Sequence, residues 1–486
     1  MTQDINQIME QAQAAFVSFR LLSGKSKKEL LYTIAEEIEA LGDHLLQTAS
    51  QESNLPVARF VGERMRTCNQ LRSFGDLVAE GSWVEAVIDT ANPENKPAPK
   101  PDMRKMLIAL GPIVVFGASN FPLAYSTAGG DTASALAAGC PVIVKAHPSH
   151  PQTSSLVAGA IHAALKRLGL DPNIFQHVEG TSFEIGKMLT QHPYTAGVGF
   201  TGSLSGGRAI FDYAQQRAVP IPVFSEMGST NPVILLDGAL ENHAAEHAKA
   251  FAGSITIGVG QFCTNPGIML GIKGKALDNF IELLASELSQ IPNYKMLSES
   301  IHQNYSSKLE KIISDKDVKT VYQANSTGSL VANSALVTVA AEEFAKNPNL
   351  HHEVFGPFSM IVICEDKFQL VEVWKMLSGQ LTTTILGTDE DLSQHADLLD
   401  IATKIAGRVI FNQIPTGVDV GNATVHGGPY PATTDSRFTS VGMDAIKRWV
   451  RPLCYQNCPD YLLPDTLKNE NPLGIMRKVN GDYNRN

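Results

Sequence analysis

Residues 113–116 read Ile113-Val114-Val115-Phe116, a short run of β-branched and aromatic side chains that is typical of a buried strand. Similar runs recur along the chain, separated by helical patterns such as Thr127–Ala138 and Ser154–Leu168. The further runs are Val142–Val144, Ile174–Val178, Gly197–Phe200 and Pro222–Phe224. Strands that alternate with helices predict βαβ units and a parallel sheet, with a nucleotide site at the carboxyl ends of the strands.

A second α/β pattern begins after residue 231. Its predicted strands are Val233–Leu236, Gly267–Ile272, Met360–Ile363 and Gly407–Phe411, with Leu277–Leu288 as one of the helices between them. A chain of 486 residues is too long for a single core. Two α/β domains with a site in the cleft between them are therefore predicted.

The flanking segments have other patterns. Residues 6–80 have helical periodicity, and Arg59, Arg64, Arg66 and Arg72 lie among acidic residues as on a solvated helix face. Residues 88–105 contain four prolines, which exclude a helix and indicate an extended arm. The polar tail beyond Asp460 either packs on a neighbour or is loose.

The composition limits the function classes. Apolar residues make up 43% and charged residues 18%, as in a soluble folded protein, and the net charge of −10 argues against nucleic acid or an anionic membrane as partner. The longest apolar tract, Met106–Ala118, is too short to span a bilayer, and the first residues lack the pattern of a secretory signal. We expect a cytosolic protein whose six cysteines are reduced.

One cysteine lies in a loop rich in glycine, Gly258-Val259-Gly260-Gln261-Phe262-Cys263-Thr264-Asn265-Pro266-Gly267. Glu226 lies in another Gly/Pro-bounded loop, Ser225–Pro232. A thiolate attacks an electrophilic carbon, and a carboxylate base activates the water that releases the acyl group. The pair predicts acyl chemistry, although a free cysteine is often a small buried hydrophobe and a loop glutamate is usually solvated.

Other candidate residues follow the predicted strands. Thr201, Gly202, Ser203 and Gly207 lie where a strand passes into a helix, as at a pyrophosphate site or in a plain turn. Lys145 ends a strand, where it meets either a nucleotide or water. Asn120 is either an oxyanion donor or a turn residue before a proline.

We expect no metal ion. His243, Glu246 and His247 form an H-x-x-E-H pattern, but both histidines fall on the polar side of a surface helix and no third ligand follows. Cys454 and Cys458 have no partner pair and are interpreted as packing residues.

Five motifs together resemble the aldehyde dehydrogenase superfamily in order and spacing, over most of the chain. They are Ser119–Pro122, Phe200–Ser203, Glu226–Gly228, Gly260–Cys263 and Glu353–Pro357. The resemblance implies a Rossmann-like coenzyme domain, an α/β catalytic domain and a small β oligomerisation arm. It also implies a homodimer or homotetramer. The expected boundaries are residues 1–87 and 106–227 with 426–450 for the coenzyme domain, 228–425 for the catalytic domain, and 88–105 and 451–486 for the arm and tail.

The resemblance also implies a role for each motif residue. Cys263 would attack the aldehyde to give a thiohemiacetal, Asn120 and the Cys263 N–H would hold its oxyanion, and Glu226 would activate water against the thioester. The residues expected to bind the coenzyme are Lys145, Ser149, Thr201, Gly202, Ser203, Gly207, Glu353 and Phe355.

Two details refine these expectations. NAD-preferring relatives carry a glutamate where this chain has Pro148 followed by Ser149, so NADP should be preferred, with NAD possible. Residues 146–151, 260–267 and 426–433 look like the 2,5-dioxovalerate (α-ketoglutaric semialdehyde) dehydrogenase subfamily. NADP-dependent fatty aldehyde dehydrogenases share much of this similarity, and a catalytically idle nucleotide-binding protein is a more distant alternative. A carboxylate substrate would need a cation, for which an arginine from the Arg59–Arg72 helix is the candidate.

Overall fold

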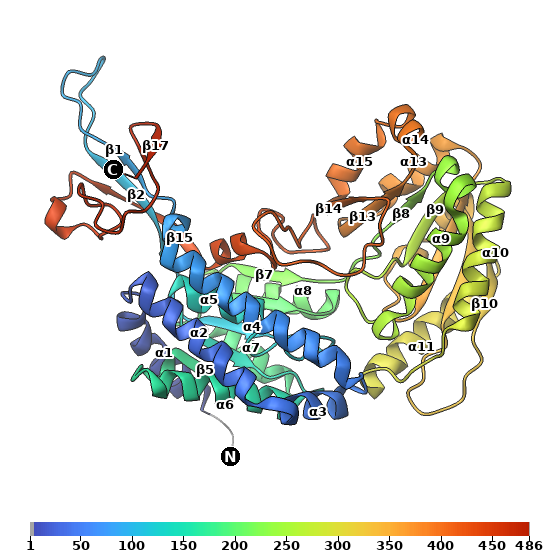
Figure 1. Ribbon diagram of the computed structural model, residues 1–486, viewed down its shortest axis with the longest axis horizontal. Helices are drawn as coiled ribbons and strands as arrows, with labels where there is room; N and C mark the ends of the chain where they lie inside the picture. The colour runs from blue at the N-terminus through green and yellow to red at the C-terminus, as the bar shows by residue number, and fades with distance from the viewer. Residues whose placement is uncertain (1–3, 486) are drawn as a thin grey trace.

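The computed structural model describes residues 4–485 and comprises three parts, each built on its own β-sheet (Figure 1). Two α/β bodies lie at opposite sides of the molecule in this view, and a narrow β arm projects from the first body. No helix among the described residues is long and apolar enough to cross a membrane.

The first body contains a five-stranded parallel sheet with the strand order β5-β4-β3-β6-β7. Its strands are β3 (Ile113–Phe116), β4 (Val142–Lys145), β5 (Phe175–Val178), β6 (Gly197–Thr201) and β7 (Val223–Glu226). The crossover elements are α5 (Gly130–Ala138), α6 (Pro151–Arg167), η2 (Pro172–Ile174), α7 (Phe183–Gln191) and α8 (Leu204–Gln215). The predicted parallel sheet is present, and most residues of its strands are buried.

Two predicted helix starts were wrong by three residues. Helix α5 begins at Gly130 instead of Thr127 because Gly129 forms a tight turn, where an added Cβ would lie 2.5 Å from the Ala124 oxygen. Helix α6 begins at Pro151 instead of Ser154, since proline is well suited to the first position of a helix.

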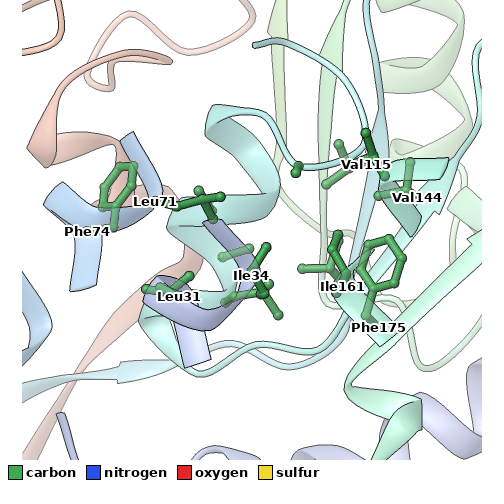
Figure 2. Packing of buried hydrophobic residues seen from close by; sticks show 14 of the residues in the cluster. Leu31, Ile34, Leu71, Phe74, Val115, Val144, Ile161 and Phe175 are labelled. Atoms are coloured by element: carbon green, nitrogen blue, oxygen red, sulfur yellow. The ribbon is translucent and has the colours of Figure 1, made fainter. Parts of the chain in front are cut away.

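The N-terminal helices cover this sheet. They are α1 (Ile5–Phe19), α2 (Gly24–Ala40), α3 (Gly42–Ser53) and α4 (Val57–Glu80). Figure 2 shows side chains of α2, α4 and α6 packing towards one face of the sheet, where Val115 and Val144 lie. The opposite face, with Val114 and Ile143, packs against α1, α7 and α8.

The second body contains a seven-stranded sheet with the order β10-β11-β12-β9-β8-β13-β14, in which only the edge pair β10 and β11 is antiparallel. Its strands are β8 (Val233–Leu235), β9 (Ile268–Ile272), β10 (Val318–Gln323), β11 (Ala335–Ala340), β12 (Phe358–Cys364), β13 (Gln380–Leu386) and β14 (Ala406–Phe411). Its helices are α9 (Asp237–Thr256), η3 (Ile257–Gly260), α10 (Lys275–Gln290), α11 (Glu299–Ile313), α12 (Ala341–Lys346), η4 (Pro348–His351), α13 (Lys367–Met376), α14 (Asp389–Gln394) and α15 (Leu398–Ile405). Separate apolar clusters line its two faces.

The arm sheet has the order β15-β2-β1-β16-β17. Its elements are η1 (Ser82–Val84), β1 (Val87–Asp89), β2 (Met103–Ala109), β15 (Val450–Gln456), η6 (Asp460–Leu462), β16 (Arg477–Val479) and β17 (Asp482–Asn484). The C-terminal tail packs on its own arm, because β16 pairs in parallel with β1. Before β15 the chain returns to the first body, where η5 (Met443–Trp449) contributes Ala445, Ile446 and Trp449 to the core.

Candidate active site

The loop before Cys263 has an unusual backbone. Gly258, Val259 and Gly260 have φ values of 57°, 60° and 65°, in the left-handed region. A Cβ on Gly260 would lie 2.2 Å from the Gly356 carbonyl carbon, so only glycine fits there. Val259 is β-branched and strained in this conformation. The sharp turn brings Cys263 against the segment that carries Glu353 and Phe355.

Asn231 ties the cysteine loop to the segment that follows Glu226. Its buried side-chain amide donates to the Cys263 and Asn265 carbonyls, both at 2.9 Å. Its oxygen accepts from the Ser229 hydroxyl at 2.9 Å and the Thr382 hydroxyl at 3.0 Å. Because all of these groups are hydrogen-bonded to one another, the loop that carries Cys263 and the loop that follows Glu226 are held as one unit.

The carboxyl ends of the first sheet's strands supply many of the predicted residues. Lys145, Thr201 and Glu226 end β4, β6 and β7, and Asn120 follows β3. A cavity of about 350 Å³ lies there, bounded on its other side by the second body. Eight of the predicted site residues line it: Asn120, Thr201, Gly202, Ser203, Glu226, Cys263, Glu353 and Phe355.

Three predicted residues, Lys145, Ser149 and Gly207, do not line this cavity. Lys145 donates to the Ala146 carbonyl at 2.9 Å, and burial lowers its pKa. The Ser149 N–H donates to the His147 ring at 3.1 Å. A Cβ on Gly207 would lie 2.6 Å from the Met227 side chain, so this glycine permits helix α8 to pack beside the Glu226 loop.

Asn120 is held in place by hydrogen bonds of both its side chain and its main chain. Its side-chain amide donates to the Gln261 carbonyl at 2.9 Å, and its main-chain carbonyl accepts from the Arg59 guanidinium at 2.6 Å. The amide nitrogen of Asn120 carries a second N–H besides the one that donates to Gln261, and Asn120 and Cys263 both line the cavity.

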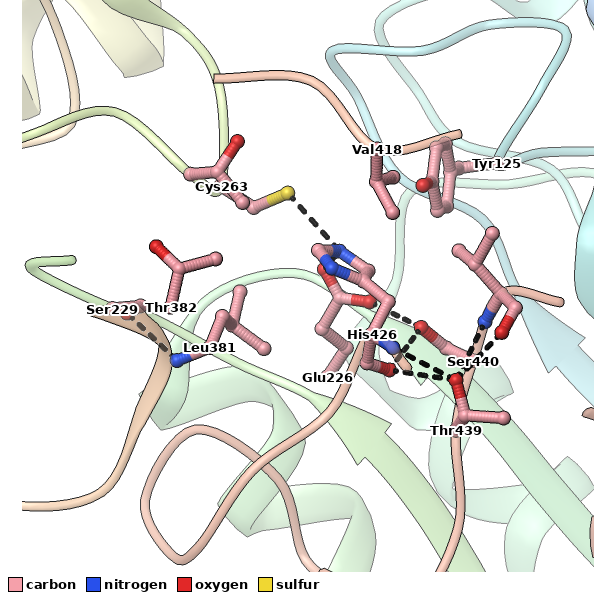
Figure 3. Close-up of polar contacts among 12 residues, drawn as sticks. Tyr125, Glu226, Ser229, Cys263, Leu381, Thr382, Val418, His426, Thr439 and Ser440 are labelled. Carbon is pink, nitrogen blue, oxygen red and sulfur yellow. Dashed lines mark hydrogen bonds and ion pairs between the residues drawn. The ribbon is translucent and has the colours of Figure 1, made fainter. Parts of the chain in front are cut away.

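His426 lies between the thiol and the carboxylate (Figure 3). Its Nε2 is 2.9 Å from Glu226 Oε1 and 3.5 Å from Cys263 Sγ, and its side chain is fully buried. Ser440 donates to the other Glu226 oxygen at 2.6 Å. The sequence assigned His426 no role, although it begins the His426–Thr433 motif. The feature of the sequence that could have indicated a role for His426 is its position before two glycines.

The hydrogen-bond pattern favours one tautomer of His426. Its Nδ1 is buried and has no hydrogen-bond partner among the described residues, whereas Nε2 faces two acceptors. The proton therefore belongs on Nε2, which donates to Glu226 and lies close enough to the sulfur to stabilise a thiolate. We infer that His426 fixes the carboxylate beside the thiol.

Electrostatics set the resting protonation of these groups. Burial, reinforced by the Glu226 carboxylate, raises the pKa of the Cys263 thiol well above its usual value. Burial alone would also raise the pKa of Glu226, but His426 and Ser440 outweigh it and lower that pKa. Burial raises the pKa of Glu353 to about 7, against the opposing effect of Lys308. At neutral pH the resting pair is a thiol beside a carboxylate.

Two arginines, Arg66 and Arg408, lie near Cys263. Arg66 donates to the Tyr125 hydroxyl at 3.2 Å and to the Val418 carbonyl at 2.6 Å, and Tyr125 and Val418 flank Cys263 and His426 in Figure 3. Arg408 donates to the Gly417 carbonyl at 2.8 Å and lies near enough to Cys263 to interact with its charge. Among the described residues neither arginine forms an ion pair, and the Nε of each is buried without a hydrogen-bond partner.

Arg59 is a third partly buried arginine in this region. Its guanidinium lies 3.6 Å from Glu63 and over the ring of Phe121. Glu63 already accepts the Leu123 and Ala124 N–H groups. Two arginines of the Arg59–Arg72 helix, Arg59 and Arg66, therefore do point towards the interior of the protein. Arg72 instead pairs with Glu39 at the surface, and Arg64 donates to the Gly42 carbonyl.

Comparisons with known proteins agree with this arrangement. The family model described as the aldehyde dehydrogenase family matches residues 1–430. Alpha-ketoglutaric semialdehyde dehydrogenase of Acinetobacter baylyi is 43% identical over 486 residues, covering 99% of this chain and 92% of that protein. Alpha-ketoglutaric semialdehyde dehydrogenase 2 of Azospirillum brasilense is 46% identical over 479 residues, covering 98% and 91%.

A solved structure shares the fold. Glyceraldehyde-3-phosphate dehydrogenase GapN of Methanocaldococcus jannaschii, complexed with NADP, superposes with a TM-score of 0.78 at 17% identity and covers 93% of both chains. At that identity the likeness concerns the fold alone, and it confirms the predicted α/β fold class.

Proposed function

This chain belongs to the aldehyde dehydrogenase family, and we propose that the aldehyde it oxidises is α-ketoglutaric semialdehyde, with α-ketoglutarate as the product. The family reaction is the oxidation of an aldehyde to a carboxylate with a nicotinamide dinucleotide. The predicted resemblance to the superfamily and to the α-ketoglutaric semialdehyde dehydrogenases is thereby confirmed.

An excess of positive charge near Cys263 carries the substrate proposal. Arg59, Arg66 and Arg408 are partly buried there, and Glu63, which pairs with Arg59, is the carboxylate next to them. Partly buried cations such as Arg66 and Arg408, which form no ion pair with a described residue, favour a ligand of opposite charge. A semialdehyde that carries a carboxylate supplies it, whereas a fatty aldehyde would place an alkyl chain against guanidinium groups.

In the proposed mechanism Cys263 forms a C–S bond to the aldehyde carbon while its thiol proton leaves to solvent. The resulting oxyanion is held by the Asn120 amide and the Cys263 N–H. After oxidation a thioester remains on the sulfur. Glu226, held by His426 and Ser440, then takes a proton from water, the hydroxide adds to the thioester, and the thiolate leaves.

The residues that line the cavity are of the kinds that bind a nicotinamide dinucleotide. Thr201, Gly202 and Ser203 precede helix α8 and offer hydroxyls and backbone amides to a pyrophosphate, and Glu353 and Phe355 face them across the cavity. When bound, the coenzyme supplies the hydride acceptor. Lys145 ends β4, two strands from β6 in the sheet, and Ser149 follows it; both would contact the adenosine ribose.

We also propose a preference for NADP over NAD. Burial lowers the pKa of Lys145, and this lysine forms no ion pair with any described residue. Pro148 and Ser149 supply no carboxylate where NAD-preferring relatives carry a glutamate. A 2′-phosphate would therefore meet an unpaired lysine without repulsion from an acid at position 148. Equal kcat/KM for NADP and NAD would contradict this preference.

The test of the substrate proposal compares α-ketoglutaric semialdehyde with pentanal and a long-chain aldehyde under identical coenzyme saturation. The proposal predicts the highest kcat/KM for the semialdehyde. A preference for the long-chain aldehyde would leave the reaction unchanged but refute the substrate.

A further inference from the structure

We propose that Glu226, Cys263 and His426 form a binding site for Zn²⁺, and that the bound ion inhibits the enzyme reversibly. Among residues 4–485 these three are the group of metal-ligating side chains whose donor atoms all lie within 4.8 Å of one another. The H-x-x-E-H histidines, His243 and His247, are not part of such a group.

The distances suit zinc. Tetrahedral zinc with Zn–S near 2.3 Å and Zn–N near 2.0 Å places its sulfur and nitrogen ligands about 3.5 Å apart. Cys263 Sγ and His426 Nε2 are 3.5 Å apart without any movement. Nitrogen and carboxylate oxygen ligands stand about 3.3 Å apart in such a site. His426 Nε2 and Glu226 Oε1 are 2.9 Å apart, and all three donor atoms lie within 4.8 Å of one another, so the carboxylate would have to shift to reach this spacing.

The three ligands come from separate segments that are each held in place. Asn231 fixes the Cys263 carbonyl, Ser440 binds the second Glu226 oxygen, and the His426 N–H donates to the Thr439 hydroxyl at 2.8 Å. Cys263 and Glu226 also border the coenzyme cavity, where a water molecule can take the fourth position. One thiolate, one imidazole, one carboxylate and one water form an ordinary four-coordinate zinc set.

Binding is balanced by the release of one proton. Zinc forms a bond to sulfur as the thiol proton leaves, and it bonds to Nε2 as the imidazole proton moves to Nδ1. Nδ1 has no hydrogen-bond partner among the described residues, whereas resident zinc histidines usually have one. This favours a reversible inhibitory ion over a permanent one. Since the sulfur is then occupied, zinc and aldehyde exclude each other.

The test uses the full chain and Zn²⁺ alone, in a background in which four other potential zinc ligands are replaced. That background is His243→Asn, His247→Asn, Cys454→Ser and Cys458→Ser, none of which belongs to the catalytic machinery. Bound zinc is measured after desalting and by competition with a chromophoric chelator. Co²⁺ serves as a second probe, because a thiolate ligand gives a charge-transfer band in the near ultraviolet.

We expect one zinc per chain in the background protein, inhibition that a chelator reverses, and the cobalt–thiolate band. His426→Asn and Cys263→Ala, each added to that background and checked for folding by circular dichroism, should each weaken zinc binding at least tenfold, on the order expected for loss of one ligand. If both folded variants bind zinc as tightly as the background, or if the background binds none, the site does not exist.

Discussion

Burial and the Glu226 carboxylate raise the pKa of the Cys263 thiol, so the attacking thiolate is scarce at neutral pH before substrate and coenzyme bind. In the proposed mechanism the same carboxylate acts later, when water attacks the thioester. Glu226 would then oppose the first step and promote the last, and replacing it should separate the two effects.

Glu226→Gln removes the negative charge beside the sulfur. We expect Cys263 to be alkylated by iodoacetamide several times faster at pH 8, because its thiol pKa falls, while steady-state turnover falls on the order of a hundredfold. Alkylation is followed by mass spectrometry and turnover by coenzyme reduction. Slower alkylation of the variant would show that the carboxylate assists formation of the thiolate.

Glu353 makes stability depend on pH. Its pKa is about 7 in the folded chain against an ordinary 4.5, so the folded state retains a proton that the unfolded state loses. Stability should therefore decline as pH rises from about 4.5 through 7. Glu353→Gln should raise the free energy of unfolding by roughly 1 to 2 kcal/mol at pH 8 and leave it unchanged at pH 4.5.

Urea titrations at the two pH values measure this difference. Glu310→Gln, at an exposed position of helix α11, is the control. A gain for Glu353→Gln that is equal at both pH values would mean that the charge of this carboxylate is not the cause.

Among the elements, the segment between β14 and η5 connects the arginines near Cys263 with His426. Arg66 from α4 and Arg408 from β14 bind carbonyls of residues 415–418, and the same segment continues to His426. Movement of either guanidinium would therefore shift this segment. Such a shift would change the substrate side of Cys263 and the position of His426.

Arg66→Met and Arg408→Met test the role of these cations. Each should lower kcat/KM for α-ketoglutaric semialdehyde by about 30- to 100-fold, the equivalent of roughly 2 to 3 kcal/mol, and change kcat/KM for pentanal by no more than about threefold. Arg72→Met, on the same helix as Arg66 but paired with Glu39 at the surface, is the control. An equal loss for both aldehydes would indicate a structural role instead.

The elements themselves were largely predictable because buried parallel strands have a strong apolar signal. The errors lay at helix starts, where Gly129 and Pro151 decided the boundary. Cys263, Glu226 and Asn120 lie in recognisable motifs, and the structure places all three around one cavity, while their catalytic roles stay predictions. His426 and Arg408 were assigned no role, because their function depends on contacts with residues distant in sequence: Glu226 is 200 positions from His426.

At the scale of the whole molecule, the arm projects away from the first body and exposes large apolar side chains (Figure 1). Tyr461 is 80% exposed, Leu462 62% and Tyr483 74%. Exposed apolar groups gathered on a projecting element indicate a protein contact. We propose that the arm joins copies of this chain into a dimer or tetramer.

Tyr461→Ser combined with Leu462→Ser should shift the sedimentation coefficient towards a smaller species, while iodoacetamide labelling of Cys263 stays unchanged. Sedimentation velocity at several protein concentrations checks the first expectation. An unaltered distribution would place the contact elsewhere.

In the proposed mechanism Cys263 carries the α-ketoglutaryl group as a thioester that Glu226 helps to hydrolyse. This acyl group can be detected by the intact mass and peptide map of Glu226→Gln after mixing with coenzyme and α-ketoglutaric semialdehyde. We expect a mass increase equal to one α-ketoglutaryl group, located on the peptide that contains Cys263. An unmodified Cys263 in a variant that still reduces coenzyme, or an acyl group on another residue, would contradict it.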